Sequence, residues 1–164
     1  AIRMIRGKAE EYRITPEQIA VCGFSAGGHL AATGLVTLKG ELKPDFGILV
    51  YPVISMKKNI THQFSRFNLM GKSPSEDTVI KFSTEEQVAE DTPATILFHC
   101  SDDPAVKPEN SIVFYQALLR NAVPAEMHVY PKGRHGWGFI EGAPFPYFNE
   151  FKTTVLRWIA EQNN

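Results

Sequence analysis

The stretch VCGFSAGGHL, residues 21–30, places a serine between glycines directly after an apolar, β-branched run. Residues 23–27 match the pattern G-x-S-x-G, which is typical of a sharp turn from a strand into a helix. Glycines beside the serine relieve crowding where the two backbones come close, and they leave the Ser25 hydroxyl exposed at the carboxyl end of the strand. The stretch therefore predicts a strand, a reactive serine and a helix in immediate succession.

Short apolar segments and helical patterns alternate along the chain. Segments rich in Val, Ile and Phe predict four buried strands, at Ile19–Phe24, Phe46–Pro52, Thr95–Ser101 and Ala125–Tyr130. The patterns around them predict helices over Ala1–Tyr12, Ala26–Leu38, Pro108–Asn121 and Tyr147–Gln162. This alternation favours a parallel sheet with right-handed crossovers and helices on both faces. The predicted fold is α/β, with three layers (α/β/α) around a parallel sheet of four strands.

The stretch 53–91 differs from the rest of the chain. It is long, polar and interrupted by proline and glycine, and it shows only short helical pieces near Pro74–Phe82 and Thr84–Val88. A long excursion after the carboxyl end of a strand commonly shapes a site in such folds. We expect residues 53–91 to lie near the reactive serine, with simple packing on the surface as the alternative.

Size and composition fit one globular domain over residues 1–164. Hydrophobic residues make up 43% of the chain and charged residues 21%, and the net charge is -1. Such a balance gives no broad attraction to nucleic acid or to an anionic membrane, and no apolar run approaches a membrane span. The first residues do not form a signal peptide. We therefore expect a soluble protein without nucleic-acid or membrane partners, and the sequence leaves open whether it is bacterial cytoplasmic or secreted.

The two cysteines, Cys22 and Cys100, each lie inside a predicted strand. Neither belongs to a CxxC pair or to a Cys/His spacing typical of a metal site. We expect both to be buried free thiols, with a disulfide between adjacent strands as the alternative.

Candidate partners for the serine follow it in the chain. A serine hydroxyl is a weak nucleophile and needs a base that a third group orients. After a turn of this kind the expected order is Ser, then Asp or Glu, then His. Asp102 and Asp103 follow the third predicted strand, and His135 follows the fourth. Because parallel strands end at one edge of the sheet, we expect Ser25, Asp103 and His135 to meet there, with Asp102 as the alternative acid.

The other four histidines are weaker candidates for the base. His99 and His128 lie inside predicted strands and are expected to be core residues, and His62 lies in the polar excursion. His29 is the strongest competitor because it follows Ser25 by one helical turn. It would project from the body of the helix, so we expect it to pack or to form a hydrogen bond near the turn.

Backbone and aromatic groups complete the predicted site. The helix that begins after Ser25 directs its free N–H groups and its positive dipole end at the serine. The N–H of Ala26, together with that of Gly27, is therefore expected to stabilise an oxyanion. Tyr51 and Trp137 are expected beside this site, where they could line an acyl or sugar pocket, with packing in the core at strand ends as the alternative.

Other chemistries find no support in the sequence. Neither G-x-x-x-x-G-K-[ST] nor G-x-G-x-x-G occurs, so a phosphate or dinucleotide site is not predicted. H-E-x-x-H is missing, and no carboxylate pair stands out for glycoside hydrolysis. We expect no metal and no organic cofactor.

Several stretches resemble those of the α/β-hydrolase esterases that are often grouped with acetylxylan esterases. They span nearly the whole chain and read PEQIAVCGFSAGGHLAA, YPVIS, SRFNLMG, EDTPATILFHCSDD, and SDDPAVKPENSIVFYQALLRNAVPAEMHVYPKGRHGWG. The resemblance implies a catalytic triad of the turn serine, the aspartate of D-D-P-x-V and the histidine of H-G. These residues correspond to Ser25, Asp103 and His135. The resemblance also implies acetylated or short-acyl ester substrates, frequently on plant-wall sugars, and no cofactor.

One family feature does not occur in this sequence. Members of the family carry an additional N-terminal half with an HGGG-type loop, whose N–H completes the oxyanion hole, and no HGGG is present here. We therefore expect a C-terminal portion of such an esterase, or a short variant. The Ile19–Phe24 strand would then form an apolar edge that pairs with a second copy of the chain.

Three functions remain open at this point. The leading expectation is a serine esterase that works through an acyl-enzyme. A serine peptidase of the prolyl-oligopeptidase type would use the same order of residues. The third alternative is an inactive fragment that only binds or assembles.

Overall fold

The computed structural model describes residues 1–140 and 144–162. Its strands are β1 (Ala20–Phe24), β2 (Phe46–Val50), β3 (Ala94–Cys100) and β4 (Ala125–Tyr130). Its α-helices are α1 (Ile2–Arg6), α2 (Ala9–Tyr12), α3 (Ser25–Thr37), α4 (Gln63–Met70), α5 (Glu76–Phe82), α6 (Glu109–Arg120) and α7 (Phe148–Glu161). Two short 3-10 helices, η1 (Gly40–Leu42) and η2 (Thr84–Glu86), complete the elements.

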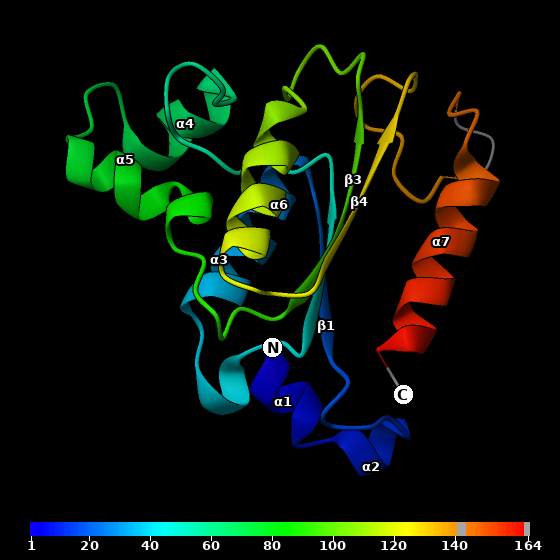
Figure 1. Cartoon of the computed structure of the whole chain (residues 1–164). Coiled ribbons are helices and arrows are strands. Elements are labelled where there is room, and N and C mark those ends of the chain that lie inside the picture. Colours follow the sequence, from blue (N-terminus) through cyan, green and yellow to red (C-terminus); the bar gives the residue numbers. More distant parts are fainter. Residues whose placement is uncertain (141–143, 163–164) are drawn as a thin grey trace.

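The four strands form one parallel sheet in the order β1-β2-β3-β4 (Figure 1). The register pairs Ile48 with Ile96 and Val50 with Phe98 in the centre of the sheet. The predicted fold class is therefore confirmed. All four carboxyl ends point to the same edge, at the top of Figure 1, so the loops that follow the strands are neighbours.

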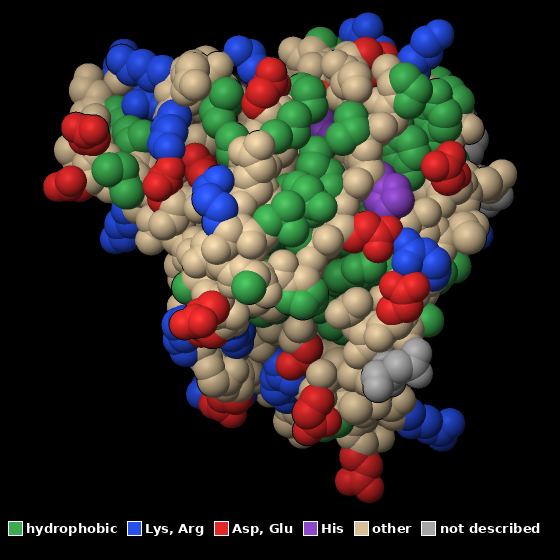
Figure 2. Space-filling model, viewed as in Figure 1, with side chains coloured by type: hydrophobic (Ala, Val, Ile, Leu, Met, Phe, Trp, Pro, Cys, Tyr) green, Lys and Arg blue, Asp and Glu red, His purple; other side chains and the backbone are tan. Residues whose placement is uncertain are grey.

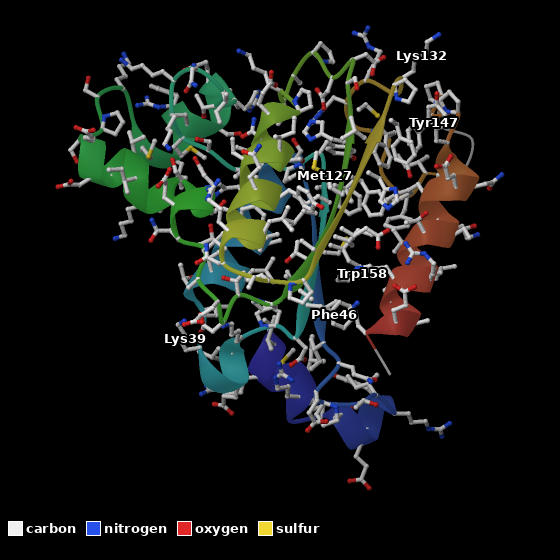
Figure 3. All side chains as sticks on the ribbon, in the orientation of Figure 1. Lys39, Phe46, Met127, Lys132, Tyr147 and Trp158 are labelled. Carbon is white, nitrogen blue, oxygen red and sulfur yellow. The ribbon has the colours of Figure 1, made fainter. Side chains whose placement is uncertain are left out.

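Helices cover both faces of the sheet. Helix α7 packs on one face through Phe151, Val155 and Trp158, whereas α3 and α6 pack on the other (Figure 1). Figure 3 shows Phe46 of β2 and Trp158 of α7 directed toward each other, and their ring centroids lie 5.5 Å apart. Two apolar clusters, one on each side of the sheet, thus form most of the core, and a smaller third cluster contains Val53, Met56 and Val106.

The central strands contribute to both clusters because successive side chains of a strand point to opposite faces. In β2, Ile48 belongs to the cluster under α7 and Leu49 belongs to the cluster under α3 and α6. In β3, Phe98 and Leu97 divide in the same way. A strand buried on both faces needs apolar side chains at every position, which explains the continuous apolar runs in the sequence.

The prediction of one helix over residues 1–12 is wrong, because the structure divides this segment into α1 and α2. The Gly7 N–H donates to the Arg3 carbonyl at 2.9 Å and closes α1. Glycine is a poor helix former, so the break falls there. The Arg6 side chain fixes the end of α1 against the next layer, since its guanidinium donates to the Asp45 carboxylate at 3.0 Å and to the Lys43 carbonyl.

The prediction that both cysteines are buried is wrong for Cys22. Both are free thiols, but only Cys100 is buried, whereas Cys22 is exposed. Cys22 lies on β1, which is one of the two edge strands of the described sheet and has a neighbouring strand on one side only. Pairing of this edge with a second copy of the chain stays a prediction.

The excursion 53–91 packs against α6 and contains a helix, α4, that the sequence pattern did not predict. The buried side chain of Asn110 in α6 holds its start, because its amide oxygen accepts from the N–H groups of Ile54 and Ser55 at 2.9 and 3.1 Å. Its amide nitrogen donates to the Ile60 carbonyl at 2.9 Å. The first part of the excursion is therefore fixed to the helix that follows β3.

Glu85, in η2 of the excursion, is a buried carboxyl with little compensation. Its side chain is 5% exposed, and its oxygens have no hydrogen-bond partner in the part of the chain that the structure describes. The Lys57 ammonium lies 3.8 Å away. Burial raises the pKa of Glu85 above its ordinary value, because the charged form loses hydration.

Replacing Glu85 with glutamine should therefore stabilise the protein near neutral pH by about 1 kcal/mol, because the amide has no charge to desolvate. A carboxyl with a raised folded-state pKa destabilises the fold above its unfolded pKa of about 4.3, so the gain should shrink as the pH falls toward that value. Urea unfolding at several pH values measures this.

The neighbouring Glu86→Gln variant is the matched control, because the Glu86 side chain is 39% exposed and forms an ion pair with Lys57. This variant should leave stability unchanged or lower it slightly. An equal gain in both variants, or a gain for Glu85→Gln that does not depend on pH, would contradict the prediction.

The surface carries both charge signs. Figure 2 shows hydrophobic side chains in the middle and upper part of one face, with acidic and basic side chains intermixed around its lower part. Exposed hydrophobic residues on α6 and β4 include Ile112, Leu119 and Val129. Among the described residues, no helix has the length and apolar character needed to cross a bilayer.

Candidate active site

Ser25 lies at the junction of β1 and α3 in a strained backbone conformation. Its φ is 52°, in the left-handed region that favours glycine. A hydrogen bond from the Val53 N–H to the Ser25 carbonyl, 2.9 Å long, ties this junction to the segment after β2. A strained serine held by neighbouring strands is typical of a functional turn.

Two of the nearby glycines are required by close packing. A Cβ on Gly23 would lie 2.4 Å from the Gly27 carbonyl oxygen, and a Cβ on Gly28 would lie 2.6 Å from Cβ of Pro52. A Cβ on Gly27 would meet no described atom within 4 Å. The motif glycine Gly23 therefore relieves crowding as expected, whereas on the helix side this role belongs to Gly28.

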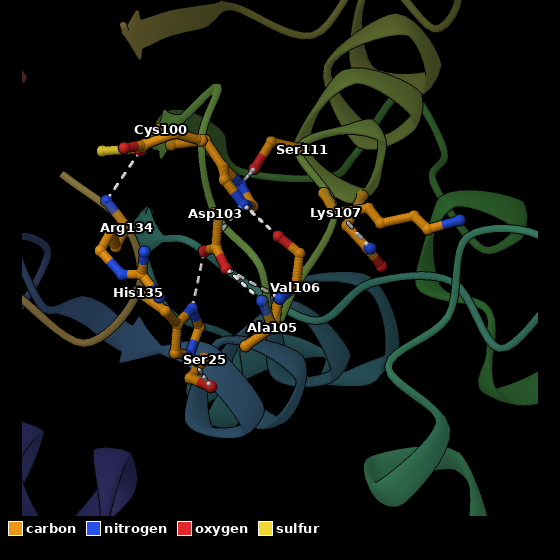
Figure 4. Close-up of polar contacts among 12 residues, drawn as sticks. Ser25, Cys100, Asp103, Ala105, Val106, Lys107, Ser111, Arg134 and His135 are labelled. Atoms are coloured by element: carbon orange, nitrogen blue, oxygen red, sulfur yellow. Dashed lines mark hydrogen bonds and ion pairs between the residues drawn. The ribbon is translucent and has the colours of Figure 1, made fainter. Parts of the chain in front are cut away.

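Three side chains from three loops form one chain of hydrogen bonds (Figure 4). The Ser25 Oγ lies 2.8 Å from Nε2 of His135, and the His135 Nδ1 lies 2.7 Å from Oδ2 of Asp103. The ionised Asp103 carboxylate only accepts, so the imidazole proton is on Nδ1, and Nε2 is free to accept from the serine hydroxyl. The loops after β1, β3 and β4 thus bring together the three residues that the sequence singled out.

Asp103 is buried and well supplied with donors. Its Oδ1 accepts from the N–H groups of Ala105 and Val106, each at 2.9 Å. Burial alone would raise the pKa of Asp103, but the hydrogen bonds from His135 and from these two amides, together with the nearby His99 ring nitrogen 3.4 Å from Oδ2, outweigh it and hold the pKa well below its usual range. The carboxylate is therefore charged at any pH near neutrality.

Asp102 has a different position. It is exposed, and its Oδ1 accepts from the Arg134 N–H at 2.8 Å. This bond fixes the backbone one residue before His135. In the described part of the chain, the carboxylate that accepts from the imidazole belongs to Asp103. Arg134 has a φ of 56°, so the histidine loop, like the serine turn, is held in a left-handed conformation.

Tyr51 and Trp137 are both packed in the core, each 3% exposed. The Tyr51 ring lies 4.6 Å from the His135 ring between centroids, and its hydroxyl accepts from the Gly138 N–H at 2.9 Å. The Trp137 ring stacks on Phe145 with centroids 4.0 Å apart. Tyr51 thus holds the histidine loop in place through the His135 ring and the Gly138 N–H. The sequence did not predict this contact.

Among the described residues, no hydrogen bond joins the ring of another histidine to the Ser25 hydroxyl. His29 is 8% exposed and its Nε2 lies 2.8 Å from the Phe82 carbonyl oxygen, so it bonds near the turn as expected. The His62 Nδ1 lies 2.8 Å from the Ser65 hydroxyl. His99 is fully buried, as expected for a core residue, whereas His128 is only partly buried and stacks on Phe98.

The first turn of α3 presents its amides beside the serine. Ala26 and Gly27 are exposed, and no side chain caps the start of α3 among the described residues. Helix α3 has 13 residues, so its amino end carries an appreciable partial positive charge. These amides are in a position to receive negative charge that develops near Ser25.

An apolar groove of about 510 Å³ begins at Ala26 and runs between α3 and α4. One wall comes from α3 and the other from the excursion, including α4 and the last residue of α5. The lining residues are Ala26, His29, Leu30, Thr33, Met56, Phe64, Ser65, Asn68, Leu69 and Phe82. The excursion thus shapes a groove next to the serine turn. The α4 residues were missed from the sequence because α4 itself was not predicted.

The family model described as the prolyl oligopeptidase family matches residues 2–161. The chain belongs to the prolyl oligopeptidase family. An acetylxylan esterase of Xylanibacter ruminicola is 33% identical over 96% of this chain and 33% of its own length. Endo-1,4-beta-xylanase B of Butyrivibrio fibrisolvens is 34% identical over 83% of this chain and 23% of its own length.

A solved structure shares the fold of this chain. The acetyl ester-xyloside bifunctional hydrolase of Caldicellulosiruptor lactoaceticus has a TM-score of 0.86 and 35% identity, over 98% of this chain and 62% of that one. The resemblance to α/β-hydrolase esterases is confirmed. The chain spans about a third of the length of the curated acetylxylan esterase that it matches.

The described part of the chain holds no group of three His, Cys, Asp or Glu side chains arranged to bind a metal ion. The titratable side chains near Ser25 instead form the serine–histidine–aspartate chain of hydrogen bonds.

The adjacent glycines of α3 provide a matched test of the serine turn. Gly28→Ala should lower the free energy of unfolding by about 1–3 kcal/mol because its Cβ would overlap Pro52. Gly27→Ala should raise it by up to about 1 kcal/mol, since alanine favours a helix and the space is open. Denaturant unfolding measures both, and equal effects would contradict the packing argument.

The two aspartates provide a matched test of the acid. Asp103→Asn should reduce kcat for any Ser25-dependent reaction by about 10⁴-fold, because the amide cannot hold the same imidazole tautomer or balance its charge. Asp102→Asn should reduce it far less, since this side chain bonds only the Arg134 N–H. Steady-state kinetics decides the matter, and a larger loss in Asp102→Asn would assign the role to Asp102.

Proposed function

We propose that the chain carries the catalytic centre of a serine carboxylic ester hydrolase. The observation that carries the proposal is the unbroken sequence of contacts from the Ser25 hydroxyl through His135 to the buried Asp103 carboxylate. The names of the relatives supply the reaction class, since they include an acetylxylan esterase and an acetyl ester-xyloside hydrolase. Membership of the prolyl oligopeptidase family agrees with nucleophilic serine chemistry.

The geometry supports a two-step mechanism. His135 Nε2 takes the proton of Ser25 Oγ as the oxygen attacks the ester carbonyl, and the amides of Ala26 and Gly27 receive the developing oxyanion. The protonated imidazole, balanced by Asp103, then gives its proton to the leaving alcohol. Water, deprotonated by His135, attacks the acyl-enzyme and releases the acid and free Ser25.

We propose acetyl and other short-acyl esters, including those of xylan and related sugars, as the substrate class. The names of two similar proteins, an acetylxylan esterase and an acetyl ester-xyloside hydrolase, support this choice. The groove between α3 and α4 begins at Ala26, so it offers a place beside the reacting carbonyl for part of the ester. Its lining is largely apolar, which favours carbon chains and the apolar faces of sugar rings.

Peptide hydrolysis is the second candidate, because the matching family model is named for a peptidase. The same triad would serve an amide, but the leaving amine is poorer and needs protonation by His135 at the moment of departure. Comparison of an ester with an amide substrate therefore separates the two activities.

The protein should hydrolyse p-nitrophenyl acetate, and Ser25→Ala should lower kcat by about 10⁴-fold or more, because Ser25 is the described hydroxyl that forms a hydrogen bond with His135. A dipeptide p-nitroanilide should react much more slowly or not at all. Release of p-nitrophenol or p-nitroaniline, followed by absorbance, provides both measurements.

A fluorophosphonate ester offers a control that needs no turnover. It should label the protein once, at Ser25, as read by peptide mass spectrometry, and Ser25→Ala should remain unlabelled. Ester hydrolysis that is equal in the wild type and in Ser25→Ala, together with no labelling, would show that the chain has only a binding or assembly role. Preference for the anilide would favour a peptidase.

A further inference from the structure

A second imidazole lies against the Asp103 carboxylate. His99, in β3, is fully buried, and its Nε2 lies 3.4 Å from Oδ2 of Asp103, the same oxygen that accepts from His135 at 2.7 Å. The His99 Nε2 also lies 2.9 Å from the Val106 carbonyl oxygen. His135 alone transfers protons in the proposed mechanism, so His99 has a different role beside the carboxylate.

The surroundings of His99 decide where its proton lies. The Val106 carbonyl can only accept, so Nε2 must carry a hydrogen. Nδ1 lies 2.7 Å from the hydroxyl of Ser111, which can donate to it. A neutral imidazole with its hydrogen on Nε2 therefore satisfies both bonds. The same nitrogen lies 3.4 Å from the Asp103 carboxylate.

The same contacts close the turn that carries the acid. The Val106 N–H donates to Oδ1 of Asp103, while the Val106 carbonyl accepts from His99. Ser111 is buried in the first turns of α6 and holds the imidazole from its other side (Figure 4). His99 thus connects β3, α6 and both ends of the turn over residues 103–106.

We propose that His99 is a positioning residue for the ester hydrolysis proposed above. It keeps the Asp103 carboxylate directed at Nδ1 of His135 by fixing the Val106 end of the turn and by placing a donor beside Oδ2. Without this donor, Oδ2 keeps a single side-chain partner, and the turn loses its tie to α6. This inference rests on the proposed function, because an effect on kcat is expected only if His135 acts as a base.

The alternative role for His99 is packing alone, and the two roles predict different measurements. A packing residue affects stability and the folded fraction, but not kcat per folded molecule. A positioning residue lowers kcat, leaves KM nearly unchanged, and alters the hydrogen bond between His135 and Asp103 in the resting protein. That bond can be followed by the far-downfield NMR resonance of the His135 Nδ1 proton, which needs no turnover.

The experiment compares His99→Leu, His99→Gln and Ser111→Ala with the wild type, using p-nitrophenyl acetate and circular dichroism to correct for the folded fraction. His99→Leu should lower kcat by about 10²-fold, the effect of a small misplacement of a catalytic group, and should shift or remove the Nδ1 resonance. His99→Gln keeps an N–H near the position of Nε2 and should recover most of the rate. Ser111→Ala should give a smaller loss in the same direction.

His128→Gln is the matched control, because His128 is a strand histidine that contacts Glu126 and Phe98 and no residue of the site. It should keep the wild-type kcat and the wild-type resonance. A folded His99→Leu protein with both properties unchanged would overturn the proposal. If His99→Leu does not fold, an unchanged kcat and resonance in Ser111→Ala would overturn it instead.

Two separate measurements test the proposed function and the role of His99: the dependence of hydrolysis on Ser25, and the Nδ1 resonance of His135. If wild-type hydrolysis does not depend on Ser25, the proposed function is wrong, whatever the His99 variants do. The Nδ1 resonance then still tests the positioning, because it reports on the His135–Asp103 bond in the free protein. Its persistence in His99→Leu would count against the inference alone.

Discussion

The site depends on the contacts that stabilise the buried Asp103 carboxylate. A charge removed from water is costly unless donors surround it, and here the donors come from the turn over residues 103–106, from β3 and from the loop after β4. Each donor also fixes the segment to which it belongs. The requirement to satisfy one carboxylate thus holds His135 at the correct distance from Ser25, with the imidazole in the correct tautomer.

Backbone strain is concentrated around this centre. Ser25, Tyr51 and Arg134 all have positive φ, although none of them is glycine. Each is held by a bond to a different strand or loop: Val53 donates to the Ser25 carbonyl, Tyr51 donates to the Phe98 carbonyl, and Arg134 donates to Asp102. Left-handed conformations of this kind persist because the packed sheet below them leaves the chain no relaxed alternative.

Strand positions and the meeting of Ser25, Asp103 and His135 could be predicted, because a parallel sheet places the loop after every strand at one edge. Helix α4 could not be predicted from the sequence. Its apolar residues Phe64 and Leu69 are exposed, so it lacks the buried apolar face that makes an amphipathic helix recognisable. The roles of Gly28 and Tyr51 also escaped prediction. They depend on close approaches between segments that only the folded chain defines.

The start of α6 joins the site to the excursion. Asn110 and Ser111 are adjacent and fully buried, but they serve different partners: Asn110 binds the backbone of residues 54 and 55, and Ser111 binds His99. The groove beside Ala26 is lined in part by the excursion, and the acid is held in part through His99. One helical turn therefore fixes both the surface that would contact a substrate and the carboxylate that orients the base, so a shift of this turn would disturb binding and catalysis together.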